Sequence, residues 1–280
     1  MIDLHLHSTA SDGRLSPSGL ILKAAEYPGS ITALTDHDTL SGLPEFTAAA
    51  EQHGVTALSG VELSADFPHG ELHLLGYNFD SESLEAVGLL SRIRSAREER
   101  NRGVFHRMET DGLPVDYHEW RKTIPGPSPG RPHIADYFVT KGIARSRREA
   151  FDRFLSEGRP YYLPRKNPPL KECVDAILSA GGIPVVAHPW SLRISFGTLV
   201  ELIPQWREIG IMGLETIHPS VNRDQSRRLS ILAEKNGFLC SGGSDYHGTP
   251  EDKRFFGKTS WGAKIPADIS ILVYLGLRQP

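Results

Sequence analysis

Histidine is unusually frequent in this 280-residue sequence, occurring twelve times, and several copies lie close to carboxylates. Near the N-terminus, DLHLH places His5 and His7 two residues apart on a predicted strand. Side chains at this spacing point to the same side of a strand, as a chelating pair requires. Imidazole and carboxylate groups with no thiolate nearby favour Zn²⁺, Mn²⁺ or Fe over iron–sulfur clusters or Cu⁺. The pattern therefore predicts a metal centre.

Further histidines and acids follow other predicted strands, each at the point where the strand ends. In chain order they are Asp36, His37 and Asp38, then Glu62, His73, His188, Glu215, His218, Asp245 and His247. In a βα barrel the carboxyl ends of the strands meet at one face, where active sites lie. We therefore expect these side chains to converge. They offer more donors than one ion needs, which indicates two or three ions, an arrangement typical of phosphoryl hydrolysis.

Two kinds of element must position these residues, because short apolar runs alternate with helical patterns at both ends of the chain. Strands are predicted at 1–7, 30–36, 55–65, 70–77, 183–187, 211–217 and 238–243. Helices are predicted at 17–27, 42–53, 170–180, 198–209, 222–236 and 266–276. Repeated βα units imply parallel strands with right-handed crossovers, although the strand at 70–77 could instead pair with the preceding one as a hairpin. The expected fold class is α/β, and about seven strands fit a closed or nearly closed TIM-like barrel.

The middle of the chain breaks this alternation and predicts a helical insertion. A long, arginine-rich helical pattern at 83–111 precedes a stretch rich in proline and glycine, 123–132, which must be a loop. Helical patterns return at 132–141 and 146–156. The domains expected from this organisation are a barrel of residues 1–82 and 169–280, and an insertion of residues 83–168 that forms a lid over the substrate.

Composition excludes several classes of protein. Hydrophobic residues make up 39% of the chain and charged residues 23%, as in ordinary globular proteins, and the net charge of −3 argues against a broadly basic nucleic-acid surface. Cys173 and Cys240 fit neither a disulfide framework nor a CxxC metal site. No signal peptide and no apolar run long enough to span a bilayer are visible. These features predict a cytoplasmic enzyme with no membrane association and no obligate protein partner.

The ordered motifs resemble those of the PHP (polymerase and histidinol phosphatase) superfamily, whose members are metal-dependent phosphoesterases on a distorted seven-stranded βα barrel. The motifs are DLHLHSTASDG, LTDHDTLSG, GVELS, ELHLLGY, VAHP and GGSDYHG, within 1–79 and about 170–262. A second set is similar to the branch that contains the 3′,5′-nucleoside bisphosphate phosphatase and related 5′–3′ exoribonucleases. That set comprises GRPHIA, EAFDRFL, YLPR, LETIHPS and SRRLSILAEKNGFLCSGGSDYHG.

The resemblance implies roles for nine donor residues, all of which have the expected type. The first ion would be held by His5, His7, Glu62 and Asp245, the second by Asp12, His37 and His247, and the third by Glu62, His73 and His188. Mn²⁺ is the ion implied most readily, with Zn²⁺ and Fe²⁺ as alternatives. Asp12 also counts among the expected substrate contacts, although Asp-Gly alone would be read as a turn.

Basic residues of the insertion are the other candidate substrate contacts. Arg131 and His133, in the proline- and glycine-rich loop, are expected to reach the barrel mouth and bind the reacting phosphate, since a guanidinium grips phosphate bidentately. Arg100 and Asn101 could bind sugar, base or phosphate, and Arg165 is a similar candidate. The alternative for the arginine-rich helix is a solvated face.

Two acids that flank His37 have alternative roles. Asp36 is expected to orient His37, as carboxylates often do for ligating histidines. Asp38 could cap the following helix or touch a metal ion. Neither is counted among the ligands.

The reaction expected from these features is phosphomonoester hydrolysis by a hydroxide generated on the metal ions, with His218 as candidate general acid. The expected substrate is a nucleoside 3′,5′-bisphosphate, which would lose its 3′-phosphate. Alternatives within the enzyme class are a 5′–3′ exoribonuclease acting on short single-stranded RNA and a histidinol phosphate phosphatase. The non-enzymatic alternative is a polymerase-associated binding module, which loss of ligands would mark, and no ligand is lost here.

Overall fold

The computed structural model describes residues 1–280 except 69, 249–253, 260 and 280. Seven strands form one sheet whose order follows the sequence. They are β1 (Ile2–Leu6), β2 (Ile31–Leu34), β3 (Thr56–Phe67), β4 (Gly70–Tyr77), β5 (Ile183–Val186), β6 (Gly213–Ile217) and β7 (Leu239–Gly242). The sheet nearly closes, because Leu6 bridges to Tyr246 just after β7 and the N–H of His7 donates to the carbonyl of Tyr246 at 3.1 Å. The predicted distorted barrel is confirmed.

The barrel is distorted because one of its strands runs against its neighbours. Strand β4 is antiparallel to both β3 and β5, whereas the other pairs are parallel. The general expectation of parallel strands is therefore wrong at β4, and the hairpin alternative is correct. Only two residues separate β3 from β4, and a parallel crossover needs a dozen or more.

Six helices pack around this sheet. They are α1 (Pro17–Ala25), α2 (Leu43–His53), α7 (Leu170–Ser179), α8 (Phe196–Glu208), α9 (Arg223–Lys235) and α10 (Ser270–Tyr274). The first helix begins as its sequence predicts: Ser16 Oγ accepts the N–H of Gly19 at 3.0 Å and Pro17 fills the first turn. Strands β1 and β2 are buried along their whole length, as expected for strands covered on both faces.

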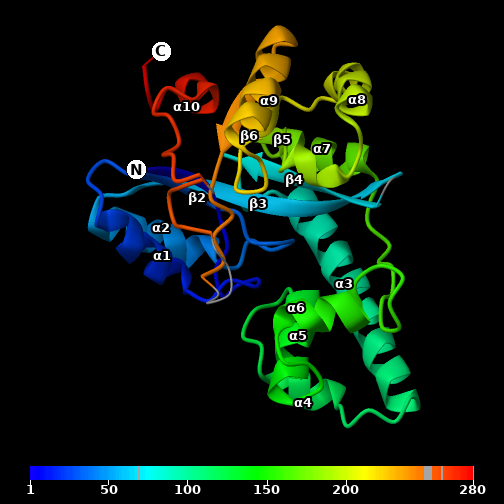
Figure 1. Cartoon of the computed structure of the whole chain (residues 1–280). Helices are drawn as coiled ribbons and strands as arrows, with labels where there is room; N and C mark the ends of the chain where they lie inside the picture. Colours follow the sequence, from blue (N-terminus) through cyan, green and yellow to red (C-terminus); the bar gives the residue numbers. More distant parts are fainter. Residues whose placement is uncertain (69, 249–253, 260, 280) are drawn as a thin grey trace.

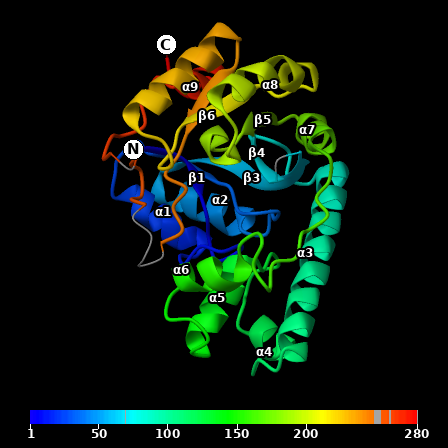
Figure 2. The ribbon, with the colours of Figure 1, turned by 45° about the vertical axis from the view of Figure 1, so that its right-hand side comes forward.

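The helices between β4 and β5 form a second body below the barrel in Figures 1 and 2. They are α3 (Leu84–Thr110), α4 (Tyr117–Lys122), α5 (Arg131–Thr140) and α6 (Arg147–Ala150), followed by a π-helical turn, Phe151–Leu155. Helix α4 was not predicted, whereas α6 and the π-helical turn together fill the helical stretch predicted at 146–156. A separate apolar core of this body surrounds Phe105, Trp120 and Phe138.

Helix α3 connects the two bodies, because its two halves belong to different cores. Leu90 and Ile93 pack in the barrel core, whereas Val104 and Met108 pack in the core of the insertion. Figure 2 shows the helix descending along one edge of the molecule from the barrel to α4. The middle of α3 therefore lies at the junction between barrel and insertion.

Arg131 and His133 were expected in a loop, and this is wrong. Helix α5 begins at Arg131, after Gly130 as its N-cap residue. The N–H of Gly130 donates to Nδ1 of His133 at 3.0 Å, and Pro132 fits a first helical turn. The loop of proline and glycine thus ends one residue before Arg131.

None of the helices in the described part of the chain has the length and apolar character needed to cross a lipid bilayer.

Candidate metal centre

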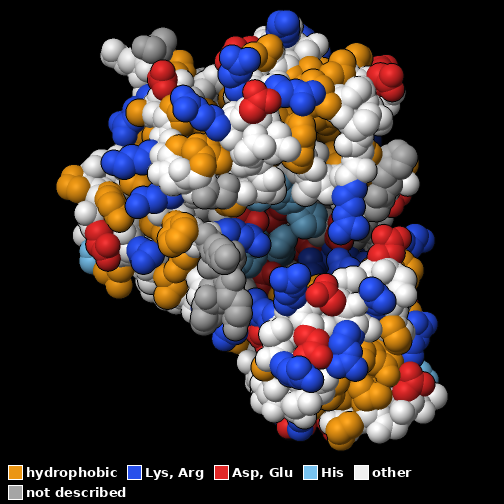
Figure 3. Space-filling model, in the orientation of Figure 1, with side chains coloured by type: hydrophobic (Ala, Val, Ile, Leu, Met, Phe, Trp, Pro, Cys, Tyr) orange, Lys and Arg blue, Asp and Glu red, His pale blue; other side chains and the backbone are white. Residues whose placement is uncertain are grey.

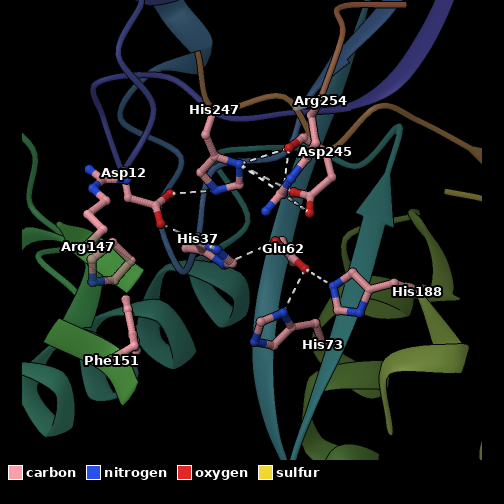
Figure 4. A pocket seen from close by; sticks show the side chains of 11 residues that line it. Asp12, His37, Glu62, His73, Arg147, Phe151, His188, Asp245, His247 and Arg254 are labelled. Carbon is pink, nitrogen blue, oxygen red and sulfur yellow. Dashed lines mark hydrogen bonds and ion pairs between the residues drawn. The ribbon is translucent and has the colours of Figure 1, made fainter. Parts of the chain in front are cut away.

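Glu62, on β3, lies at the centre of the polar residues that gather at one end of the barrel (Figure 4). Its side chain is only 1% exposed. Five histidines surround it, with nitrogen-to-carboxylate distances of 3.3 Å for His5, 3.2 Å for His7, 3.0 Å for His37, 2.8 Å for His73 and 3.0 Å for His188. His5, His7, His37 and His188 lie at or just after the carboxyl ends of β1, β2 and β5, as the strand-end pattern predicts. Glu62 and His73 were also expected at strand ends, but they lie within β3 and the antiparallel β4.

The donor atoms form groups small enough to surround single ions. Within each of four groups, one ligand atom per residue lies within 4.8 Å of the others; the groups are His7, Asp12, His37 and His247; His5, His7 and Asp245; His5, Glu215 and His218; and His37, Glu62 and His73. His188 contacts Glu62 of the last group. The structure thus brings together all nine residues that the resemblance implied, and their division among three ions stays a prediction.

Several buried donor atoms have no hydrogen-bond partner among the described residues. They are Nε2 of His5, both ring nitrogens of His7, Oε2 of Glu62 and Nδ1 of His73. A buried polar atom without a partner costs on the order of 1–3 kcal/mol. A cation bound between these nitrogens and oxygens removes that cost, so the residues present fit divalent metal ions.

The ring of His5 is oriented by Glu215, on β6. Oε1 of Glu215 lies 2.9 Å from Nδ1 of His5, so Nδ1 carries the proton and Nε2 faces the other donors. The second oxygen of Glu215 accepts the backbone N–H of His188 at 2.7 Å. Glu215 therefore positions two candidate ligands, a role typical of carboxylates behind metal-binding histidines. Glu215 was expected at a strand end, but its positioning role was not predicted.

Backbone conformation at the centre is strained where ligands are presented. His188 and Asp245 have φ angles of 27° and 48°, in the left-handed region that non-glycine residues rarely adopt. Just before Asp245, Gly243 lies so close to β1 that a Cβ atom there would come within 2.2 Å of the Cβ of His5. A residue without a side chain is therefore required for Asp245 to reach the histidine pair.

Electrostatics at the centre depend on burial and on the carboxylates. Burial alone would lower the pKa of His5, but the carboxylates of Glu215, Glu62 and Asp245 outweigh burial and raise that pKa well above its ordinary value. At His37 burial prevails and lowers the pKa to about 3, despite the nearby carboxylates. Because ligating nitrogens must be unprotonated, metal affinity at such a centre falls as the pH falls.

The two acids beside His37 do not play the roles expected of them. Asp36 does not orient His37; its Oδ1 accepts the N–H of Ser8 at 2.7 Å and the hydroxyl of Ser11 at 2.5 Å, which holds the loop that carries Asp12. Asp38 does not cap α2, whose N-cap residue is Gly42. It accepts the N–H of Ser64 at 2.8 Å and contacts Arg97 and Arg165 instead.

A cavity of about 440 Å³ opens beside the candidate ligands, in the cleft between barrel and insertion (Figures 3 and 4). Arg147, Phe151 and Arg254 complete its wall. Arg254 contacts the carboxylate of Asp245. None of these three was expected at the site from the sequence, although Arg254 follows the GGSDYHG motif closely. His218 is not among the described residues that line this cavity.

A second cavity, of about 360 Å³, adjoins the first and is rich in arginine. Both cavities share Asp12, His37 and His73 as lining residues. Its cationic residues are Arg97, Arg100, Arg131 and Arg165. Arg131, which was expected to contact the reacting phosphate, lines this second cavity together with Arg100 and Arg165.

Two expected substrate contacts lie elsewhere. Nδ2 of Asn101 donates to the carbonyl of Pro129 at 2.9 Å, which holds the loop before α5, and Asn101 lines neither cavity among the described residues. His133 lines a third cavity, on the far side of Asp12.

Arg97 was missed, although the spacing along α3 contained the signal. Ile93, Arg97, Arg100 and Val104 recur at intervals of three or four residues, which places them on one face of the helix. The residues at both ends of this series are buried in cores. Two arginines that interrupt a buried apolar stripe are therefore expected to face an interior site.

Protein purified without chelator is expected to carry more than one equivalent of transition metal by elemental analysis, because the donors form overlapping groups. Adding Mn²⁺ to stripped protein at a hundred times its Kd should stabilise the fold by about 2.7 kcal/mol, which corresponds to a rise of about 5–10 °C in Tm for a chain of this size. At most one equivalent, with no change in Tm on adding Mn²⁺, would contradict this ligand assignment.

Comparisons with known proteins agree with this geometry. The PHP domain family matches residues 3–146. The chain is 34% identical to a 3′,5′-nucleoside bisphosphate phosphatase of Chromobacterium violaceum, over 92% of this chain and 91% of that protein. It is 32% identical to a 5′–3′ exoribonuclease of Haemophilus influenzae, over 88% of this chain and 89% of that protein. A candidate metal-dependent phosphoesterase of Bifidobacterium adolescentis superposes with a TM-score of 0.86 at 28% identity, covering 98% of this chain and 95% of the other.

Proposed function

This chain belongs to the PHP family and is a metal-dependent phosphoesterase, and from that premise we propose that it removes the 3′-phosphate from nucleoside 3′,5′-bisphosphates. The observation that carries this proposal is the pair of adjoining cavities. One is lined by the candidate metal ligands and the other by four arginines. A substrate with two phosphates can place one in each.

Arg100 is the strongest indication that the second cavity takes an anion. Its side chain is buried, with the residue only 8% exposed, and Nε has no hydrogen-bond partner among the described residues. Burial lowers the pKa of Arg100 well below its usual value, and repulsion from Arg97, Arg131 and Arg165 lowers it further. A phosphate bound here supplies the acceptors that this guanidinium lacks.

In this proposal two or three Mn²⁺ ions, with Zn²⁺ or Fe²⁺ as alternatives, would be held by the three ligand sets that the resemblance implies. Divalent cations at such sites polarise phosphoryl oxygens and lower the pKa of water. The residues of the chain position the ester: Arg147, which pairs with Asp136, and Arg254, which pairs with Asp245, line the same cavity with positive charge. Arg100, Arg131 and Arg165 hold the phosphate that does not react, and this binding energy places the other one correctly.

His218 is better suited to positioning than to proton donation. Its Nδ1 accepts the N–H of Ser220 at 3.0 Å, so the proton is on Nε2, which lies 3.2 Å from the carboxylate of Asp245. The ring thus fixes one candidate ligand from behind the cavity wall. We therefore assign to His218 the role of orienting Asp245 and not that of general acid.

One observation favours short single-stranded RNA as a second candidate substrate. The third cavity, of about 490 Å³, shares Asp12 and Arg147 with the first. The cleft therefore continues on both sides of the metal centre, and a second nucleotide of a short RNA could occupy this extension. Kinetic assays with nucleoside bisphosphates and with a short 5′-phosphorylated RNA distinguish the two substrates.

The proposal is tested by comparing kcat/KM for 3′,5′-bisphosphates of the four nucleosides with the values for 3′- and 5′-monophosphates, histidinol phosphate and a short 5′-phosphorylated RNA. We expect the bisphosphates to exceed the monophosphates by about tenfold to a hundredfold, the value of a charge-assisted contact of about 1.5–3 kcal/mol. Equal values for mono- and bisphosphates, or a preference for histidinol phosphate, would overturn the nucleotide assignment. Faster cleavage of the RNA would favour the exoribonuclease.

Arg100→Gln is expected to lower kcat/KM for the bisphosphate about tenfold to a hundredfold and to leave the 3′-monophosphate unaffected. Its Tm should not fall, because the substitution removes a buried charge without a partner. Arg102→Gln, on the same helix with a side chain 56% exposed, is the matched control and should behave like the wild type. Equal losses with both substrates in Arg100→Gln would contradict a role for Arg100 in binding the second phosphate.

A further inference from the structure

The arginine cavity already contains an acid of its own, Glu71, at the start of β4. Oε1 of Glu71 lies 2.5 Å from Nη2 of Arg165 and 3.3 Å from Nδ2 of Asn167. Oε2 lies 3.5 Å from Nη2 of Arg131. One carboxylate thus bridges two of the arginines that line the cavity, one of them from the first turn of α5 and the other from the segment before α7.

Glu71 differs from the other acid that contacts these arginines. Asp38 is fully buried and also accepts two hydrogen bonds from Ser64, so it belongs to the fixed framework of the barrel. The side chain of Glu71 is 29% exposed and lines the cavity itself. An entering ligand can therefore reach the carboxylate of Glu71 but not that of Asp38.

Geometry and charge together suggest what Glu71 does. Four guanidinium groups line the cavity, and among the described residues their ion pairs involve only Glu71 and Asp38. A phosphate bound by Arg131 and Arg165 would need the donors that Glu71 now occupies, and its negative charges would repel the carboxylate. The two anions cannot use the same N–H groups at once.

We propose that Glu71 is a specificity-determining residue. Its carboxylate competes with the non-reacting phosphate for the guanidinium groups of Arg131 and Arg165. The assignment of the cavity to that phosphate rests on the proposed function. In the free protein the carboxylate keeps the guanidinium groups together against their mutual repulsion. On binding, the phosphate displaces the carboxylate, so the affinity for the anion is the difference between the two interactions. Weak or singly charged anions do not displace it.

The experiment compares the wild type with Glu71→Gln and with the matched control Glu51→Gln, all loaded with Mn²⁺. Glutamine keeps the size of the side chain and one acceptor, and removes the charge. Glu51 is exposed on α2, lines none of the three cavities, and is in none of the ion pairs between described residues. A third variant, Glu71→Ala, checks that the effect comes from the lost carboxylate and not from new contacts of the amide.

Two readouts separate this inference from the proposed function. In Glu71→Gln, KM for adenosine 3′,5′-bisphosphate is expected to fall about tenfold, with kcat within about twofold and no change in KM for adenosine 3′-monophosphate. Calorimetric titration with inorganic sulfate should show binding about tenfold tighter than in the wild type. Glu51→Gln should match the wild type in both measurements, and Glu71→Ala should change in the same direction as Glu71→Gln.

Unchanged or weaker sulfate binding in both Glu71 variants would overturn the competition, whatever the enzyme hydrolyses. A fall in KM that is equal for the bisphosphate and the monophosphate would also overturn it, because the effect would not come from the second phosphate. If the wild type shows no preference for bisphosphates, the proposed function is wrong. The sulfate titration then still decides whether Glu71 competes for the arginines.

Discussion

Replacing Glu62 with glutamine is expected to lower kcat/KM by at least about a thousandfold, or about 4 kcal/mol. Five histidines lie within 3.3 Å of its carboxylate, and it is the one acid common to two of the expected ligand sets. An uncharged amide cannot bridge two cations with equal strength, and its NH₂ group faces nitrogens that need an acceptor or a metal. Steady-state kinetics and elemental analysis of the same preparation measure both consequences.

Asp66→Asn is the matched control for Glu62→Gln, because it removes the same charge from the same strand at an exposed position. It should keep the activity and metal content of the wild type. Thermal unfolding shows whether Glu62→Gln is folded when loaded with Mn²⁺. A folded Glu62→Gln protein with full metal content and more than about a tenth of the activity would contradict the central place given to Glu62.

Replacing Asp38 with alanine is expected to destabilise the protein by about 3–5 kcal/mol, the usual cost of removing one partner from a buried ion pair. Asp38 accepts from Nη1 of Arg165 at 3.0 Å and also contacts Arg97 and Ser64. Burial raises the pKa of Asp38, but Arg97 and Arg165 outweigh burial and hold the pKa well below its usual range. Without the carboxylate, two buried guanidinium groups lose their shared acceptor. Urea unfolding of the metal-loaded protein measures the difference.

A double variant distinguishes the loss of the ion pair from a simple packing defect. Asp38→Ala combined with Arg97→Met should be less destabilised than Asp38→Ala alone, because methionine removes one of the two uncompensated charges. A decrease below about 1 kcal/mol in the free energy of unfolding of Asp38→Ala, or additive decreases in the double variant, would contradict a stabilising ion pair between Asp38 and the two arginines.

Much of the barrel could be predicted from local pattern. Strands such as Ile31–Leu34 and Ile183–Val186 are short apolar runs, and Ser16 and Pro17 predict where α1 begins. The direction of β4 was not determined by periodicity, because a strand has the same alternation in either direction; the short connection to β3 decides it. Helix α4 is only six residues long, too short for a helical period to emerge from its sequence.

Most candidate ligands could also be predicted, because the carboxyl ends of parallel strands in a barrel converge; Glu62 and His73 instead lie within β3 and the antiparallel β4. The arginines could not be assigned in the same way. Arg97, Arg131 and Arg254 reach the cleft from segments whose docking depends on tertiary contacts and not on local pattern. Asp36 shows a related limit: its position beside His37 suggested contact with that ring, whereas the chain turns the carboxylate toward Ser8 and Ser11.

The identity of the product from adenosine 3′,5′-bisphosphate tests the central claim most directly. If the metal centre acts on the 3′-phosphate while the arginine cavity holds the 5′-phosphate, the Mn²⁺-loaded protein releases inorganic phosphate and adenosine 5′-monophosphate in equal amounts. Chromatography of the reaction mixture, with ³¹P NMR of the products, distinguishes adenosine 5′-monophosphate from adenosine 3′-monophosphate. Accumulation of adenosine 3′-monophosphate, or no release of phosphate by metal-loaded protein, would contradict the account.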